Sequence, residues 1–395
     1  MNNLIGLGFE VIPFTKQCRH YTRDMEFAME MIQRIRAEKI EAVVSFNYFP
    51  MISMVCNTCR MPYFAWVFDS PHFTLYAKQI HLPCNHIGIF DKEMVEHLKG
   101  YGVKTVCHVP LAVDMDYFAA QIERVSGRSI DERKTKYWCD ISFVGSLYTG
   151  DYNYYDTLFS EGMARADELI EKQCFDYEHD YLRSAIVLGD IDFGSMREAM
   201  EQQGLILGED YFAAPQDILL PSVLEKKVTV EERKRLLLKV AEYCKDGGQS
   251  IEDGGLAGAG RKFSLYTGSD LTQLPQLKKY HKGIVDYHTQ MPLVFGSSRI
   301  NLNIPLRSIH SGIPLRVLDI MACGGFVLTN WQPEIAENFK EGVEIATFRS
   351  LEECMEKIDY YLCHEEERLA IAHAGCWKVQ EKFNYTEGLS KLFGM

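Results

Sequence analysis

Residues 297–330 read SSRINLNIPLRSIHSGIPLRVLDIMACGGFVLTN and combine two strand patterns with one helix pattern. The strand patterns are RINLNI at 299–304 and GFVLT at 325–329. Between them, Pro314 stands where a first-turn proline belongs, and the helix that follows leads to Gly324 and Gly325. Two short apolar strands joined by a helix predict a parallel pair with the helix packed against the sheet.

The same alternation of strands and helices continues in both directions along the chain. Helix patterns begin at Asp24 and Asp91, and Ser350 with Glu353 forms a capping box for another helix. The further strand patterns lie at 42–46, 63–68, 86–90, 104–109, 139–150, 263–267 and 343–348. We therefore predict an α/β fold of two doubly wound, Rossmann-like domains with helices on both faces of the sheets.

Residues 115–136 are polar and charged, and the domain boundary is expected near 120–136. A chain of 395 residues exceeds what one hydrophobic core usually supports. We assign an N-terminal α/β domain to 1–125 and a second α/β domain to 137–376, with a helical insertion at about 151–260. The N-terminus looks like the end of a first helix, so we expect the usual first strand to be missing or replaced.

Composition narrows the class of protein. The net charge of −13 argues against a nucleic-acid-binding protein, because phosphate binding depends on clustered Lys and Arg. No apolar run approaches the roughly 18 residues that span a bilayer, and no signal peptide is apparent, so we expect a cytoplasmic protein without a transmembrane segment. Cys56 and Cys59 form a CxxC pair that nothing nearby completes, so no metal site is predicted.

A locally basic segment at 295–318 predicts an anion site. It contains no Asp or Glu, where about three would be expected from the composition, but it contains Arg299, Arg307 and Arg316. Arg316 falls in the first turn of a helix, where free N–H groups favour an anion such as a diphosphate. Gly145 and Ser146 follow a strand and could form a backbone cradle for phosphate. The alternative is that each arginine only pairs with a surface carboxylate.

The run from SSRINLNI at 297–304 to YYLCHEEERLAIAHAG at 360–375 resembles the C-terminal domain of spore-maturation-protein-type glycosyltransferases, a branch of the GT-B group. YFAWVFDSPHFTLY at 63–76 is similar to the N-terminal domain that often precedes it. The resemblance implies a nucleotide sugar held by the C-terminal domain, a glycan or protein acceptor at the N-terminal domain, and transfer in the cleft between them. It also implies that the last helix, within 377–395, returns to the N-terminal domain.

The resemblance further implies catalysis without a metal or other cofactor, so the triplet at 190–192 is not interpreted as a metal-binding DxD motif. Asp319 stands where related enzymes carry the second glutamate of E-x7-E, but the first position is Ser311. That departure leaves the donor and the stereochemical outcome open. Glu334 stands where the group often has an acidic residue near the donor, although it could equally complement a helix dipole.

Asp69 is the candidate catalytic base. It follows the apolar run YFAWVF, so it should lie at the carboxyl end of a buried parallel strand, and Pro71 leaves Asp69 and His72 on a turn. His72 could share the role of base. The alternative is that Asp69 only caps its own turn. Two other functions remain open: a GT-B-fold epimerase acting on a nucleotide sugar, and a non-catalytic protein that binds one.

Overall fold

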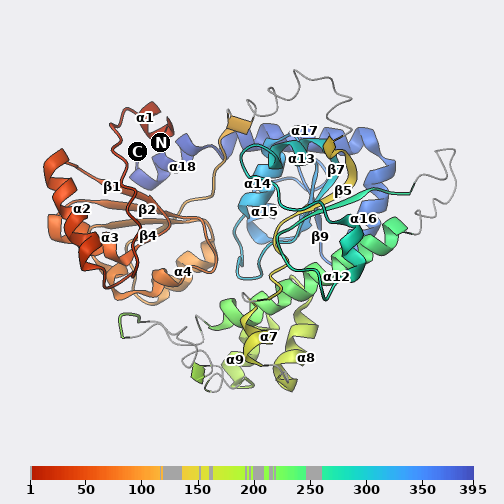
Figure 1. The fold of residues 1–395 in the computed structure, drawn as a ribbon, viewed down its shortest axis with the longest axis horizontal. Helices are drawn as coiled ribbons and strands as arrows, with labels where there is room; N and C mark the ends of the chain where they lie inside the picture. Colours follow the sequence, from red (N-terminus) through yellow and green to blue (C-terminus); the bar gives the residue numbers. More distant parts are fainter. Residues whose placement is uncertain are drawn as a thin grey trace.

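The computed structural model contains two parallel sheets, each with its own helices (Figure 1). The first sheet has four strands and the second has five. The structure describes residues 2–115, 117–118, 136–150, 153–159, 163–191, 194, 197–198, 209–212, 217, 219–245 and 260–395. The predicted α/β fold with two Rossmann-like domains is confirmed.

The strands of the first sheet lie in sequence order, β1-β2-β3-β4. They are β1 Val43–Phe46, β2 Tyr63–Val67, β3 Asn85–Ile89 and β4 Val106–His108. Each strand is therefore followed by its neighbour on the same side. Because the connections between parallel strands are right-handed, all of these connections lie on one face of the sheet. That face is packed by α2 Met25–Glu38, α3 Pro50–Cys59, α4 Lys92–Gly100 and the 3-10 turns η1 Phe73–Tyr76 and η2 Lys78–His81.

The opposite face of the first sheet is covered by helices from the two ends of the chain. These helices are α1 Asn2–Gly6 and α18 Tyr385–Phe393. Trp66 and Val109 on the sheet pack against Leu389 and Leu392 of α18. A Cβ added to Gly388 would lie 2.0 Å from the Trp66 ring, so α18 can approach this closely only with glycine there.

The second sheet has the order β6-β5-β7-β8-β9. The winding direction reverses after β6, so β5 and β7 are neighbours at a topological switch point, where open α/β sheets bind ligands at the carboxyl ends of their strands. The strands are β5 Cys139–Val144, β6 Phe263–Tyr266, β7 Ser298–Asn303, β8 Val327–Asn330 and β9 Ala346–Phe348. The helical elements are η4 Pro275–Tyr280, α13 Met291–Ser297, α14 Leu315–Ala322, α15 Pro333–Asn338, α16 Leu351–Cys363 and α17 Glu365–Lys382.

Between β5 and β6 the chain forms a group of helices, seen at the bottom of Figure 1. These are α7 Tyr154–Leu158, α8 Ala164–Gln173, α9 Tyr181–Leu188, the π-helix η3 Leu220–Leu224 and the long α12 Glu225–Lys245. They share a hydrophobic cluster of their own. Residues 209–212 pair with the first domain, where Lys78 N–H donates to the Asp210 carbonyl at 2.9 Å.

The helix ends follow the predicted chemistry with small shifts. The Asp24 carboxylate accepts from Phe27 N–H at 3.0 Å, and the Ser350 hydroxyl accepts from Glu353 N–H at 3.1 Å. The Glu353 carboxylate accepts from Arg349 N–H at 2.6 Å, one residue before the position that the capping box predicts. Pro314 is the N-cap of α14 rather than its first helical residue. Among the described helices, none is both long and apolar enough to span a membrane.

Candidate functional site

Arg233 of α12 lies between the carboxyl ends of β5 and β7. Its Nε donates a hydrogen bond of 2.8 Å to the carbonyl of Ile304, which follows β7. Its Nη1 donates to the carbonyl of Ser146, which follows β5. Arg233 is only 7% exposed, and its guanidinium lies 4.9 Å from the centre of the Tyr148 ring. This side chain therefore joins the two strand ends at the switch point.

The charges of Arg233 and of its neighbour Lys226 are not neutralised by carboxylates. Burial lowers the pKa of Arg233. Burial, and then repulsion from Arg233, lowers the pKa of Lys226, whose Nζ lies 5.2 Å from the centre of the Tyr148 ring. In the part of the chain that the structure describes, neither side chain forms an ion pair. Because cations that are buried or partly buried without a neutralising carboxylate are costly, this pair of side chains favours an anionic ligand.

Gly145 and Ser146 lie beside this pair of cations, in the turn after β5. The Ser146 hydroxyl lies 3.2 Å from the hydroxyl of Ser269 and accepts from Tyr148 N–H at 2.9 Å. A Cβ on Gly145 would lie 3.3 Å from the Phe143 ring, which favours glycine. The turn therefore brings the hydroxyl groups of Ser146 and Ser269 together after β5, but the N–H of Tyr148 is already bonded within the protein.

Arg316 and Asp319 lie on α14, where they form an ion pair of 3.1 Å. The Tyr287 hydroxyl donates to the other oxygen of Asp319 at 2.9 Å. Asp319 is 1% exposed, and burial raises its pKa to about 6, although Arg316 and Tyr287 act in the opposite direction. Arg316 is close enough to Arg233 to lower its pKa further. Arg316 is therefore near the cation pair, with its own charge matched by Asp319.

The other two predicted arginines lie apart from this group. Arg299 is the second residue of β7 and so lies near the amino edge of the sheet, where it pairs with Asp140 at 3.0 Å and donates to the Leu362 carbonyl. Arg307 pairs with Glu232 at 3.2 Å and donates to the Gln173 carbonyl at 2.7 Å. Arg307 thus fastens the loop after β7 to the inserted helices, and neither arginine faces the switch point.

Glu334 and Ser311 lie in a buried contact between the domains. The Ser311 hydroxyl is 2.9 Å from an oxygen of Asp91 and 2.8 Å from an oxygen of Glu334. Glu334 also accepts from Lys92 N–H at 2.9 Å, and its second oxygen lies 2.8 Å from Nε2 of His108. Glu334 is 1% exposed, so the structure places it against the N-terminal domain.

Asp69 and His72 lie after β2 in different surroundings. The exposed Asp69 carboxylate accepts from the Asn47 side-chain amide at 2.6 Å. His72 is partly buried, which lowers its pKa, and its Nε2 lies 2.7 Å from the Thr74 hydroxyl and 3.1 Å from the Tyr48 carbonyl. His72 therefore supports its own loop. Ser70, which follows Asp69, donates to the Ser308 carbonyl at 2.7 Å. This bond holds the Asp69 loop against the second domain.

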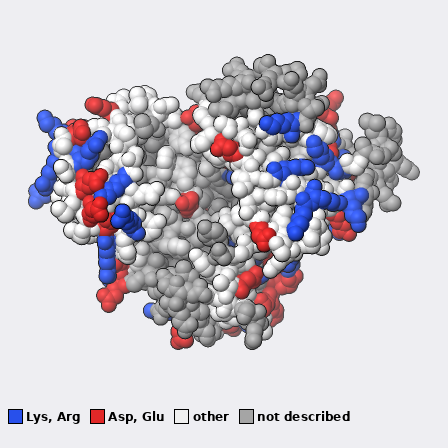
Figure 2. Space-filling view, in the orientation of Figure 1, with Lys and Arg blue, Asp and Glu red and all other residues white. Residues whose placement is uncertain are grey.

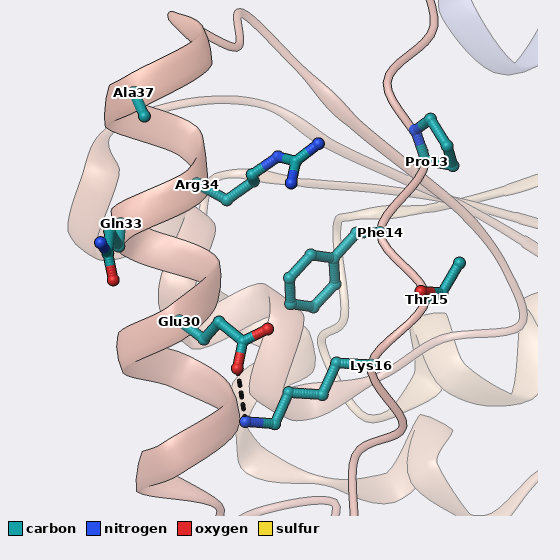
Figure 3. A pocket seen from close by; sticks show the side chains of 8 residues that line it. All are labelled: Pro13, Phe14, Thr15, Lys16, Glu30, Gln33, Arg34 and Ala37. Carbon is teal, nitrogen blue, oxygen red and sulfur yellow. Dashed lines mark hydrogen bonds and ion pairs between the residues drawn. The ribbon is translucent and has the colours of Figure 1, made fainter.

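Two other features lie outside this site. Asp190 pairs with Arg165 at the surface, whereas Asp192 lies outside the described residues; no cluster of metal-binding side chains occurs in the described ranges. A groove of about 340 Å³ runs between Pro13–Lys16 and α2, on the side of the first domain away from the second (Figures 1 and 3). Lys16 in this groove pairs with Glu26 and Glu30, so its charge is matched.

Comparisons with known proteins agree with this fold. Residues 251–393 match the family described as glycosyl transferase-like. The structure of Anabaena HepE in complex with UDP-glucose is 9% identical, with a TM-score of 0.50, and the match covers 93% of this chain and 80% of that one. A glycosyltransferase from Rickettsia africae is 11% identical, with a TM-score of 0.49, 100% coverage of this chain and 86% of that one. No curated protein sequence matches the chain. The chain thus has the two-domain GT-B fold, with a C-terminal region similar to glycosyltransferases.

Proposed function

We propose that the protein is a cytoplasmic, spore-maturation-type glycosyltransferase that moves a sugar from a nucleoside-diphosphate sugar to a hydroxyl group of a glycan or protein. The observation that carries the proposal is the pair Lys226 and Arg233 at the switch point of the second sheet, two cations that form no ion pair with any described carboxylate. The family match of residues 251–393 and the UDP-glucose bound to Anabaena HepE support the same class of ligand.

In this proposal the diphosphate binds to Lys226, Arg233 and the first turn of α14. These cations stabilise the negative charge that develops on the departing nucleoside diphosphate, without a bound metal. Arg316 contributes from α14, and Asp319 with Tyr287 fixes its orientation. Asp69 accepts the proton of the attacking hydroxyl, while its hydrogen bond to Asn47 keeps the carboxylate in place.

The proposal is tested by measuring the melting temperature with UDP-, GDP-, ADP- and dTDP-sugars. A ligand that binds only the folded state raises this temperature by mass action. The best ligand is then tested for transfer to acceptors, before and after dialysis against EDTA. We expect stabilisation by one class of nucleotide sugar and transfer that EDTA does not abolish. If no nucleotide sugar stabilises the protein, the proposed function is wrong.

Binding without transfer is the second candidate, and Ser311 favours it. Related enzymes carry a glutamate at this position, whereas Ser311 is engaged with Asp91 and Glu334 in the domain contact. A binding protein would be stabilised by the nucleotide sugar and would leave it unchanged. An epimerase would isomerise the sugar without an acceptor. Consumption of the donor only when an acceptor is present supports transfer and excludes both alternatives.

A further inference from the structure

An exposed aromatic surface lies at the carboxyl end of β1. Phe46 ends this strand, which is an edge strand of the first sheet, and its large apolar side chain is 57% exposed. Its ring packs edge-on against Phe68, with centroids 5.0 Å apart, and against Tyr385 at 6.3 Å. We call Phe46, Phe68 and Tyr385 the aromatic surface.

The aromatic surface lies between the candidate base and the donor site. Phe46 is followed by Asn47, whose side chain holds the Asp69 carboxylate at 2.6 Å. On the other side, Tyr385 lies near Asp319: burial first, and then the charge of Asp319, raise the pKa of Tyr385 to about 12. Asp319 in turn pairs with Arg316, which contributes to diphosphate binding in the proposed function. A molecule on this surface would therefore lie between Asp69 and the bound donor.

The edge of the first sheet that carries this surface has no free positive charge among the described residues. The segments 40–59 and 61–77 contain no Lys or Arg. Further along the edge, Lys92 pairs with Glu337, and His108 lies 2.8 Å from Glu334. Where side chains are visible in Figure 2, Lys and Arg gather on the outer flanks of the two lobes. An acceptor with a phosphate or carboxylate group would meet Asp69 here with no cation to balance its charge.

We infer that the acceptor is an uncharged sugar ring, an inference that rests on the proposed glycosyltransferase function. The apolar C–H face of the ring packs on Phe46, because the negative face of an aromatic ring attracts the weakly positive C–H hydrogens. One acceptor hydroxyl then points to Asp69. Its oxygen forms a bond to the anomeric carbon of the donor, the bond from that carbon to the diphosphate breaks, and the proton moves to Asp69. The nucleoside diphosphate leaves with the bonding electrons and stays beside Lys226, Arg233 and the first turn of α14.

The inference is tested by saturation-transfer NMR on the full chain with UDP present. The probes are neutral methyl glycosides of glucose, galactose, mannose and N-acetylglucosamine, with glucose 6-phosphate and glucuronic acid as charged counterparts. The variant is Phe46→Ala, and the matched control is Val44→Ala, which changes another exposed residue, 38% exposed, on the same face of β1. Melting temperatures establish that both variants fold.

We expect at least one neutral glycoside to bind through its ring protons, with affinity about fivefold to tenfold lower in Phe46→Ala and unchanged in Val44→Ala. Preferred binding of the charged sugars, equal binding by Phe46→Ala, or no binding of any neutral glycoside would overturn the inference. Stabilisation by nucleotide sugars is measured separately on the same variants. If nucleotide sugars stabilise the protein but no glycoside binds, only the acceptor class is refuted. If no nucleotide sugar stabilises the protein, the proposed function is refuted.

Discussion

Lys226 and Lys227 are adjacent on α12, but the structure predicts opposite effects of their removal. Lys227 bridges Asp156 at 2.7 Å and Glu231 at 2.9 Å; burial alone would lower its pKa, but these bonds outweigh burial and raise it. Lys226 forms no ion pair in the described structure, and burial lowers its pKa. Folding therefore favours the charged form of Lys227 and disfavours the charged form of Lys226.

Lys226→Ala should weaken nucleotide-sugar binding and leave the melting temperature unchanged or higher. Loss of one charge-assisted contact to a diphosphate costs about 1.5 to 3 kcal/mol, which weakens Kd by about tenfold to 100-fold. Lys227→Ala should leave Kd unchanged and lower stability by about 1 kcal/mol, since it removes a partly buried ion pair. Calorimetric titration gives Kd, and thermal unfolding gives stability. Equal Kd values for wild type and Lys226→Ala, or a larger loss of affinity in Lys227→Ala, would refute the assignment of the anion site.

Three further predictions concern single side chains. Asp69→Asn should retain nucleotide-sugar affinity and Tm but lower kcat by about 100-fold, because the amide cannot accept a proton; full activity would remove Asp69 from the mechanism. Burial raises the pKa of Asp319 from 3.8 to about 6, so folding favours its protonated form and stability should fall as the pH rises through this range. Asp319→Asn should remove that decrease from a plot of Tm against pH, and superimposable plots would contradict the burial argument. Arg299→Ala should lower Tm, since Asp140 loses its 3.0 Å partner, while Kd for the nucleotide sugar stays the same; a weakened Kd would place Arg299 in the donor site.

The strands could be predicted from sequence because each is a short apolar run between polar turns. β7 was expected at 299–304 and is observed at Ser298–Asn303, and β2 was expected at 63–68 and is observed at Tyr63–Val67. The winding of the first sheet was not predictable in this way, because alternation of strands and helices is the same whether successive strands wind in one direction or reverse. The prediction of helices on both faces holds, but the second face is covered by α1 and α18.

The site was harder to predict, because local charge does not show which cations are paired. Arg316 lies near Arg233, whereas Arg299 comes from the same basic segment but lies near the start of its strand, at the opposite edge. Lys226 and Arg233 were not identified, because α12 is rich in Lys, Arg and Glu at spacings typical of an ion-paired surface helix. Only the fold shows that Lys227 is paired with Asp156 and that Lys226 is not.

The position of α18 has a consequence for the order in which the protein is completed during synthesis. The strands of the first sheet leave the ribosome before α18, but Trp66 and Val109 pack against Leu389 and Leu392 of that helix. Most of this apolar surface therefore stays open to water, and to other nascent chains, until α18 has been synthesised. The hydrophobic core on this face of the first sheet is therefore completed only when α18 is made. A chain that stalls before residue 385 would present this surface to chaperones.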